Sequence, residues 1–184
     1  MSASEIVQRW RVRGGYVLAV VVLLLARPTL SSILLGAVIG SVGLFIRAYA
    51  AGFLHKQEVL TVTGPYAYTR NPLYFGSSIL ALGAAVAMHS LWAAGLLLAY
   101  FALVYSVVMR REETELRHKH GASFDAYAES VPLFFPQLTP SRKLGGGEGS
   151  FSLAQYEKNR EYRASVGYFL FLLLLAIICR LRVV

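Results

Sequence analysis

Two polar segments of the chain carry the residue types that could do chemistry. The first reads GPYAYTRNPLYFG, over residues 64–76, with a helix expected to begin at Pro72. Asn71 is suited to be the N-cap of that helix, because asparagine and a following proline both favour a helix start. The free N–H groups and positive dipole end of such a helix, with Arg70 beside them, can hold a carboxylate or a phosphate. The alternative is that Arg70 extends to the lipid surface and the tyrosines form an aromatic belt.

The second segment reads RREETEL, over residues 110–116, and is expected to continue a membrane helix beyond the bilayer. Helical spacing places Glu112 and Leu116 on one face. A carboxylate there favours a cation such as a sulfonium or an ammonium, and aromatic rings add cation–π attraction. Because adjacent helical residues differ by about 100° in direction, we expect Glu113 to face elsewhere as a surface group. The alternative is a solvated cluster in which arginines pair with glutamates.

A third stretch places Phe124, Tyr127 and Val131 on one helical stripe, which could cover a site or simply pack. His118 and His120 would point to different helix faces and belong to no metal-binding motif, and Cys179 is the one cysteine. We therefore expect no metal site. The net charge of +8 lies in loops beside hydrophobic segments, which indicates lipid head groups rather than nucleic acid.

The elements that must position these residues are membrane helices. Of the 184 residues, 56% are hydrophobic, above the roughly 45–50% of soluble domains. A spanning helix needs about 20 apolar residues, so the first and last runs are short. The sequence predicts an all-α, polytopic integral membrane bundle of about five transmembrane helices, with spans near residues 14–26, 29–46, 72–88, 91–109 and 164–179.

The chain divides into three parts by composition. Residues 1–140 form the expected membrane core, in which the hairpin of the third and fourth spans brings the two polar segments together. Residues 141–150 are a Gly-rich linker, and residues 151–184 hold an interfacial helix over 151–163 followed by the last span. Small residues at helical spacing predict close contact between the second and third spans, at Ser32, Gly36, Gly40, Gly83 and Ala87.

The first segment, the Glu112-Glu113 pair and the pattern from Gly121 to Pro136 together resemble the isoprenylcysteine carboxyl methyltransferase and phospholipid methyltransferase superfamily. The resemblance covers roughly Arg47 to Pro136, about half of the chain. It implies a helical membrane fold with a cytoplasmic pocket for S-adenosylmethionine and access for a lipid from the bilayer. It also implies that the cofactor contacts are Val59, Leu60, Thr61, Tyr66, Asn71, Pro72, Leu73, Tyr74 and Glu112.

Two departures from the superfamily pattern leave the catalytic residues unassigned. The usual Arg-His-Pro is Arg70-Asn71-Pro72 here, and asparagine cannot act as a general base. The arginine that the superfamily offers to the substrate falls on Val108. Arg110 or Arg111 could replace it, and the candidate catalytic residues are Arg70, Arg110 and Arg111.

The function expected from the resemblance is methyl transfer from S-adenosylmethionine to a membrane-embedded lipid or isoprenoid-type acceptor, at a carboxylate or an amine. Such a transfer requires alignment of donor and acceptor and exclusion of water, with no covalent enzyme nucleophile. Two alternatives stay open at this point. One is a nicotinamide-dependent membrane enzyme related to sterol reductases, and the other is a non-enzymatic membrane assembly protein.

The distribution of basic residues predicts the orientation of the chain. Fifteen of the 18 Lys and Arg residues lie before the first span or in the loops on the same side. The positive-inside rule then places the N-terminus and the site in the cytoplasm, at the cytoplasmic membrane in a prokaryote. With five spans, a reporter fused after Val184 should be active outside. A cytoplasmic signal from that fusion would show that the last segment does not cross.

Overall fold

The computed structural model describes residues 3–55, 59–141 and 149–183, without the side chains of residues 3–13 and 183. These residues form helices and loops, and none of the described residues lies in a strand. The all-α prediction is therefore confirmed. Most of the expected Gly-rich linker, residues 142–148, lies outside the described residues. The elements are α1 (Ala3–Leu25), α2 (Leu30–Phe53), the 3-10 helix η1 (Gly64–Ala67), α3 (Pro72–Met88), α4 (Leu91–His120), α5 (Ala122–Ser130), α6 (Leu153–Lys158) and α7 (Tyr162–Val183).

Three of the described helices are long and apolar enough to cross a membrane, namely α2, α4 and α7. The apolar part of α1, Gly14–Leu25, and the whole of α3 are shorter. A helical membrane bundle is thus confirmed, while the count of five spans stays a prediction. Helix α4 continues well beyond the predicted limit of its span, to His120, as the sequence indicated for the glutamate-containing segment.

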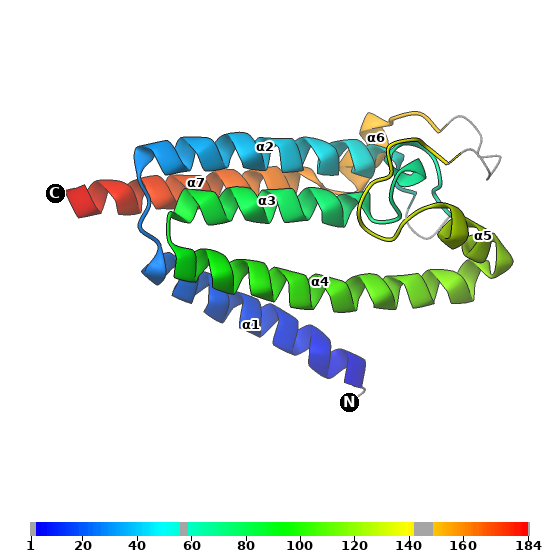
Figure 1. Ribbon diagram of the computed structural model, residues 1–184, viewed down its shortest axis with the longest axis horizontal. Coiled ribbons are helices and arrows are strands. Elements are labelled where there is room, and N and C mark those ends of the chain that lie inside the picture. Colours follow the sequence, from blue (N-terminus) through cyan, green and yellow to red (C-terminus); the bar gives the residue numbers. More distant parts are fainter. Residues whose placement is uncertain (1–2, 56–58, 142–148, 184) are drawn as a thin grey trace.

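The helices lie in two layers (Figure 1). Helices α2, α3 and α7 run side by side, and α1 packs against α4 beneath them. The tight turns before α2 and before α4 lie at the end of the bundle where the C-terminus lies. The opposite end gathers η1, α5, α6 and the extension of α4. Polar segments far apart in the sequence therefore meet at one end of the bundle.

The contact between α2 and α3 is made backbone to backbone. A Cβ atom on Gly36 would come within 2.5 Å of the Gly83 carbonyl oxygen, and one on Gly43 within 2.6 Å of the Gly76 carbonyl oxygen. The Ser32 hydroxyl donates a hydrogen bond to the Ala87 carbonyl across the same contact, at 3.1 Å. The predicted close contact of small residues is therefore confirmed. In lipid, apolar side chains gain no hydrophobic free energy by packing against one another. Helices there associate through close backbone contact at small residues.

The expected interfacial helix over residues 151–163 is wrong as a single helix. Helix α6 ends at Lys158, Arg160 takes a left-handed conformation with φ 56°, and α7 begins at Tyr162. Helix α2 in turn extends to Phe53, past the predicted end of its span at residue 46.

Side-chain amides of the C-terminal segment bind carbonyl groups at the end of α2. The last carbonyls of a helix have no partner within it. The Asn159 side-chain amide donates to the carbonyls of Ala51 and Leu54, at 2.8 and 2.9 Å, and the Gln155 amide also donates to Leu54. These bonds dock the C-terminal segment on the end of α2.

Replacing Gly43 with alanine tests the helix contact. The added methyl group cannot fit against the α3 backbone, so we expect Gly43→Ala to lower the free energy of unfolding by about 1–3 kcal/mol. The matched control is Gly95→Ala in α4, where a Cβ atom meets nothing within 4 Å. Thermal unfolding of both variants in one detergent measures the difference. Equal unfolding temperatures would contradict the tight contact.

Candidate functional site

A pocket of about 730 Å³ lies at the end of the bundle where α2 ends and α3 begins. The nine residues that the resemblance selected all line it, and so does Arg70. They come from the loop after α2, from η1, from the start of α3 and from α4. The structure therefore brings the predicted site residues together around one space, which also borders on Leu54, His55, Glu115, Leu116, Lys119, His120 and Tyr127.

The floor of the pocket depends on the short helix η1. Gly64 has φ 59°, and a Cβ atom on it would lie 2.5 Å from the Phe53 ring, so this position requires glycine. The chain then turns so that Tyr66 packs on Ala50 and Phe53, leaving it 6% exposed. The turn thus fixes the Tyr66 ring in the pocket wall.

A strap formed by residues 131–141 holds the next residues in place. The Thr69 hydroxyl donates to the Phe134 carbonyl at 2.9 Å, and the Arg70 backbone N–H donates to the Pro132 carbonyl at 2.9 Å. The Gln137 side-chain amide donates to the Ala67 carbonyl at 3.0 Å. The loop between η1 and α3 therefore has a defined shape without secondary structure of its own.

Asn71 occupies the N-cap position of α3, but its side chain makes no cap hydrogen bond. The side-chain amide donates instead to the Leu133 carbonyl of the strap, at 3.0 Å. Asn71 therefore takes the predicted N-cap position, but its side chain does not cap the helix, because the bond from its amide nitrogen to the strap orients the side chain elsewhere. The proline at the first helical position still favours the helix start.

Glu112 faces the pocket and is tied to α3. The Tyr74 hydroxyl donates to its carboxylate at 2.6 Å, which joins α3 to the extended part of α4. Leu116 lines the same pocket, as the helical spacing predicted. The carboxylate is thus held at the wall of the pocket by a charge-assisted hydrogen bond.

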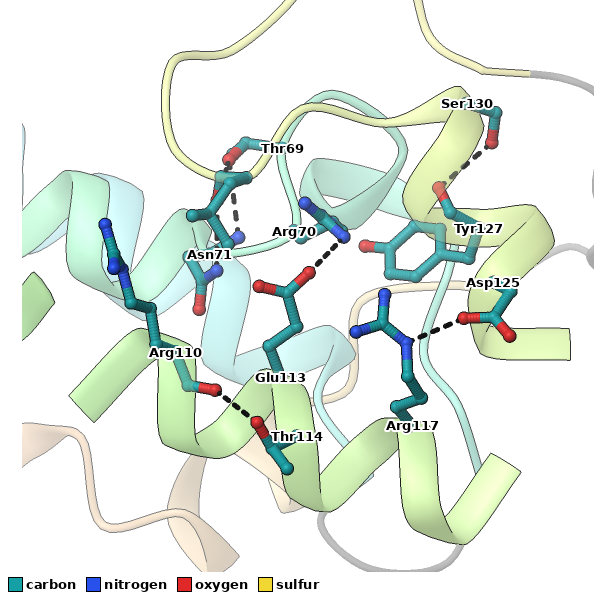
Figure 2. Close-up of polar contacts among 11 residues, drawn as sticks. Thr69, Arg70, Asn71, Arg110, Glu113, Thr114, Arg117, Asp125, Tyr127 and Ser130 are labelled. Carbon is teal, nitrogen blue, oxygen red and sulfur yellow. Dashed lines mark hydrogen bonds and ion pairs between the residues drawn. The ribbon is translucent and has the colours of Figure 1, made fainter. Parts of the chain in front are cut away.

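Glu113 is not the surface group that the sequence indicated. Its carboxylate accepts a hydrogen bond from Arg70 at 2.7 Å, and the two side chains are only 21% and 13% exposed. Figure 2 shows Glu113 reaching from α4 toward Arg70, while Arg117 of α4 pairs with Asp125 of α5. The expectation failed because the loop before α3 brings Arg70 to this face of α4, where it pairs with the second glutamate.

Two of the three candidate substrate arginines lie away from the pocket. Arg111 pairs with Glu115 along α4 at 2.8 Å and is exposed. Arg110 is also exposed and, like Arg111, does not line the pocket. Only Arg70 of the three is brought to it.

Sequence reasoning missed Arg47 and Glu161, which both line the pocket. They form a bidentate ion pair at 2.8 Å, with side chains 18% and 12% exposed. Arg47 could have been found, because the residues after it stay apolar to Phe53, and a charge inside an apolar helix marks a functional position. Glu161 carries no comparable signal, since it lies in the C-terminal segment that the resemblance does not cover.

The pocket contains buried donors that lack an acceptor. Among the described residues, the Tyr66 hydroxyl and the Arg70 Nε are buried without a hydrogen-bond partner. Burial raises the pKa of Tyr66 far above its usual range, so the hydroxyl keeps its proton. Burial also raises the pKa of Tyr127, whose hydroxyl donates to the Tyr66 carbonyl at 2.8 Å. Because buried polar groups are nearly always paired, these two donors are exceptions among the described residues.

The profile of the phospholipid methyltransferase family matches residues 15–123, which is more than half of the chain. The chain belongs to this family. The family is part of the integral membrane methyltransferase superfamily, so the resemblance seen in the sequence is confirmed. The match covers α1 to α4 and ends at the start of α5, so the strap, α6 and α7 lie outside it.

Two curated relatives are named for resistance to metals. The chain is 36% identical over 107 residues to the nickel-cobalt-cadmium resistance protein NccN of Alcaligenes xylosoxydans xylosoxydans, covering 58% of this chain and 49% of the relative. It is 32% identical over 127 residues to the cobalt-zinc-cadmium resistance protein CzcN of Cupriavidus metallidurans, covering 68% of this chain and 56% of the relative. The chain thus spans about half the length of these relatives. No solved structure matches it significantly. In the part of the chain that the structure describes, no group of three or more His, Cys, Asp or Glu residues is placed to hold a metal ion.

Two ion pairs of equal length allow a matched test of Glu113. We expect Glu113→Gln to lower the free energy of unfolding by about 1–3 kcal/mol, because it leaves the Arg70 charge enclosed without a partner. The control is Asp125→Asn, which breaks a 2.7 Å pair whose side chains are both 52% exposed. Exposed pairs contribute about 0–1 kcal/mol. If the two variants unfold at the same temperature, Glu113 is a surface group after all.

Proposed function

We propose that this chain is an S-adenosylmethionine-dependent methyltransferase that acts on a membrane-embedded lipid or isoprenoid-type acceptor. One observation carries the proposal. A chain of the phospholipid methyltransferase family has one pocket in which all nine residues implied by the superfamily resemblance meet, with two buried donors that lack acceptors.

The residues of the pocket suit the chemical groups of this cofactor. Its volume of about 730 Å³ is within the roughly 300–1,000 Å³ usual for small-molecule sites. The positive charge of Arg70 suits a carboxylate, and the carboxylate of Glu112 suits a cationic sulfonium or ammonium. Val59 and Leu60 offer apolar surface to a ring system.

The bound cofactor would supply a methyl group on a positively charged sulfur. The chain's own residues would orient the reactants and exclude water. Phe124, Tyr127 and Val131 form a buried cluster against Leu60 and Val62. The stripe predicted from the sequence therefore supports the segment that lines the pocket, and it closes that side of the site to solvent.

Cofactor binding separates this proposal from the alternatives. Purified protein in detergent should bind S-adenosylmethionine and not a reduced nicotinamide nucleotide. Tyr66→Phe keeps the ring that packs on α2 but removes the unpaired hydroxyl, so we expect binding to weaken by up to about tenfold. Isothermal titration calorimetry measures the dissociation constants.

The matched control for Tyr66→Phe is Tyr16→Phe, because Tyr16 is 71% exposed on α1 and does not line the pocket. It should leave the affinity unchanged. Binding of the nicotinamide alone would favour a reductase, and binding of neither nucleotide would favour an assembly protein. A Tyr66→Phe variant with wild-type affinity would remove Tyr66 from the cofactor contacts.

A further inference from the structure

A second, mostly apolar cavity of about 520 Å³ lies between the two layers of the bundle. Its walls come from α1, α3, α4 and α7, with Arg47 of α2, and include Leu18, Ala84, Phe101 and Phe171. The volume is in the range of small-molecule sites. The side chains that the structure describes leave this space open, so it offers room for a hydrocarbon chain.

This cavity and the polar pocket share a boundary. Arg47 lines both of them. Its Nη1 donates to the Leu73 carbonyl, of a pocket residue, at 3.3 Å, and to the hydroxyl of Ser77, a cavity residue. Beside it, the Tyr105 ring of the cavity meets the Tyr74 ring of the pocket edge to face, with centroids 5.1 Å apart. A ligand that occupies both spaces would therefore be polar on one side of Arg47 and apolar on the other.

Arg47 lies at the junction of the pocket and the cavity, and neither Arg110 nor Arg111 lines either space. Its Nε and Nη2 donate to the Glu161 carboxylate, so all three of its guanidinium nitrogens have partners. The pair presents a neutral, fixed polar surface to the junction. Glu161 is supplied by the turn between α6 and α7, so the C-terminal segment takes part in the site.

We propose that Arg47 is a specificity-determining residue for the acceptor, held in position by Glu161, and that the acceptor is a single-chain amphiphile. The hydrocarbon chain lies in the apolar cavity, and the polar head lies beside the Arg47–Glu161 pair at the entrance to the pocket. That the bound amphiphile accepts a methyl group rests on the proposed function, but its binding can be measured without the cofactor.

The position of the hydrocarbon chain is tested by photocrosslinking. The probes are palmitate and hexadecylamine, each with a diazirine near the end of its chain, and the crosslinked residues are located by mass spectrometry. Wild-type crosslinks should fall on the cavity wall. Gly167→Leu should remove most of them, because Gly167 lines the cavity and a Cβ atom there meets nothing within 4 Å.

Gly95→Leu is the matched control, since Gly95 also has open space around it, on a spanning helix, but does not line the cavity. It should leave the crosslinks unchanged. Crosslinks spread over the outer helix faces, or equal yields in Gly167→Leu and Gly95→Leu, would overturn the placement of the chain.

The role of Arg47 is tested by the ratio of palmitate to hexadecylamine crosslinking. Glu161→Gln leaves the Arg47 cation without its counter-charge, so the ratio should rise about tenfold. Arg47→Gln leaves the Glu161 anion, so the ratio should fall by a similar factor. A purely structural pair would change both probes equally, and an unchanged ratio in both variants would overturn the proposal.

Two further variants keep this test independent of folding. The double variant Arg47→Gln/Glu161→Gln removes both charges, so its ratio should lie between those of the two single variants. Glu157→Gln changes an exposed glutamate one turn earlier and should have no effect. Cofactor titration on the same samples separates the outcomes, because loss of cofactor binding with normal crosslinking would contradict only the proposed function.

Discussion

The close approach of α2 to α3 is the constraint on which the rest of the structure depends. Gly43 and Gly76 bring the two backbones into contact, and the same contact places the stem of Arg47 within 2.8 Å of where a Gly76 side chain would begin. Arg47 therefore reaches Ser77 and the Leu73 carbonyl from the neighbouring helix. A side chain at either glycine would push the helices apart and withdraw Arg47 from the boundary between pocket and cavity.

Ion pairs join further segments at the same end of the bundle. Arg47 binds the turn between α6 and α7 through Glu161, and Arg70 binds α4 through Glu113. Both pairs are largely enclosed, and breaking such a pair costs more than forming it contributes, because a charge is left behind. The pairs thus act mainly to fix where the segments lie. The strap adds neutral hydrogen bonds at the same end of the bundle.

The sequence was sufficient to predict the helices and the pocket but not the pairing within it. Local patterns in the sequence predicted the helices, the close contact of small residues and the residues that line the pocket. The structure contains each of these features. The side-chain bond of Asn71 could not be foreseen because its partner, the Leu133 carbonyl, is 62 residues away. Glu113 was misjudged because the loop before α3 brings Arg70 to it, and Glu161 was missed because its partner lies 114 residues earlier. Long-range contacts of this kind leave no periodicity to detect.

The central claim is that the pocket between the loop after α2, the start of α3 and the extension of α4 holds S-adenosylmethionine. The most direct measurement is ultraviolet crosslinking of methyl-tritiated S-adenosylmethionine to the wild-type protein, followed by identification of the labelled peptides. We expect label on residues 59–76 or on the segment around Glu112, and we expect that label to be lost when unlabelled cofactor is in excess. Label confined to the outer faces of α1 or α7, or label that excess cofactor does not displace, would contradict it.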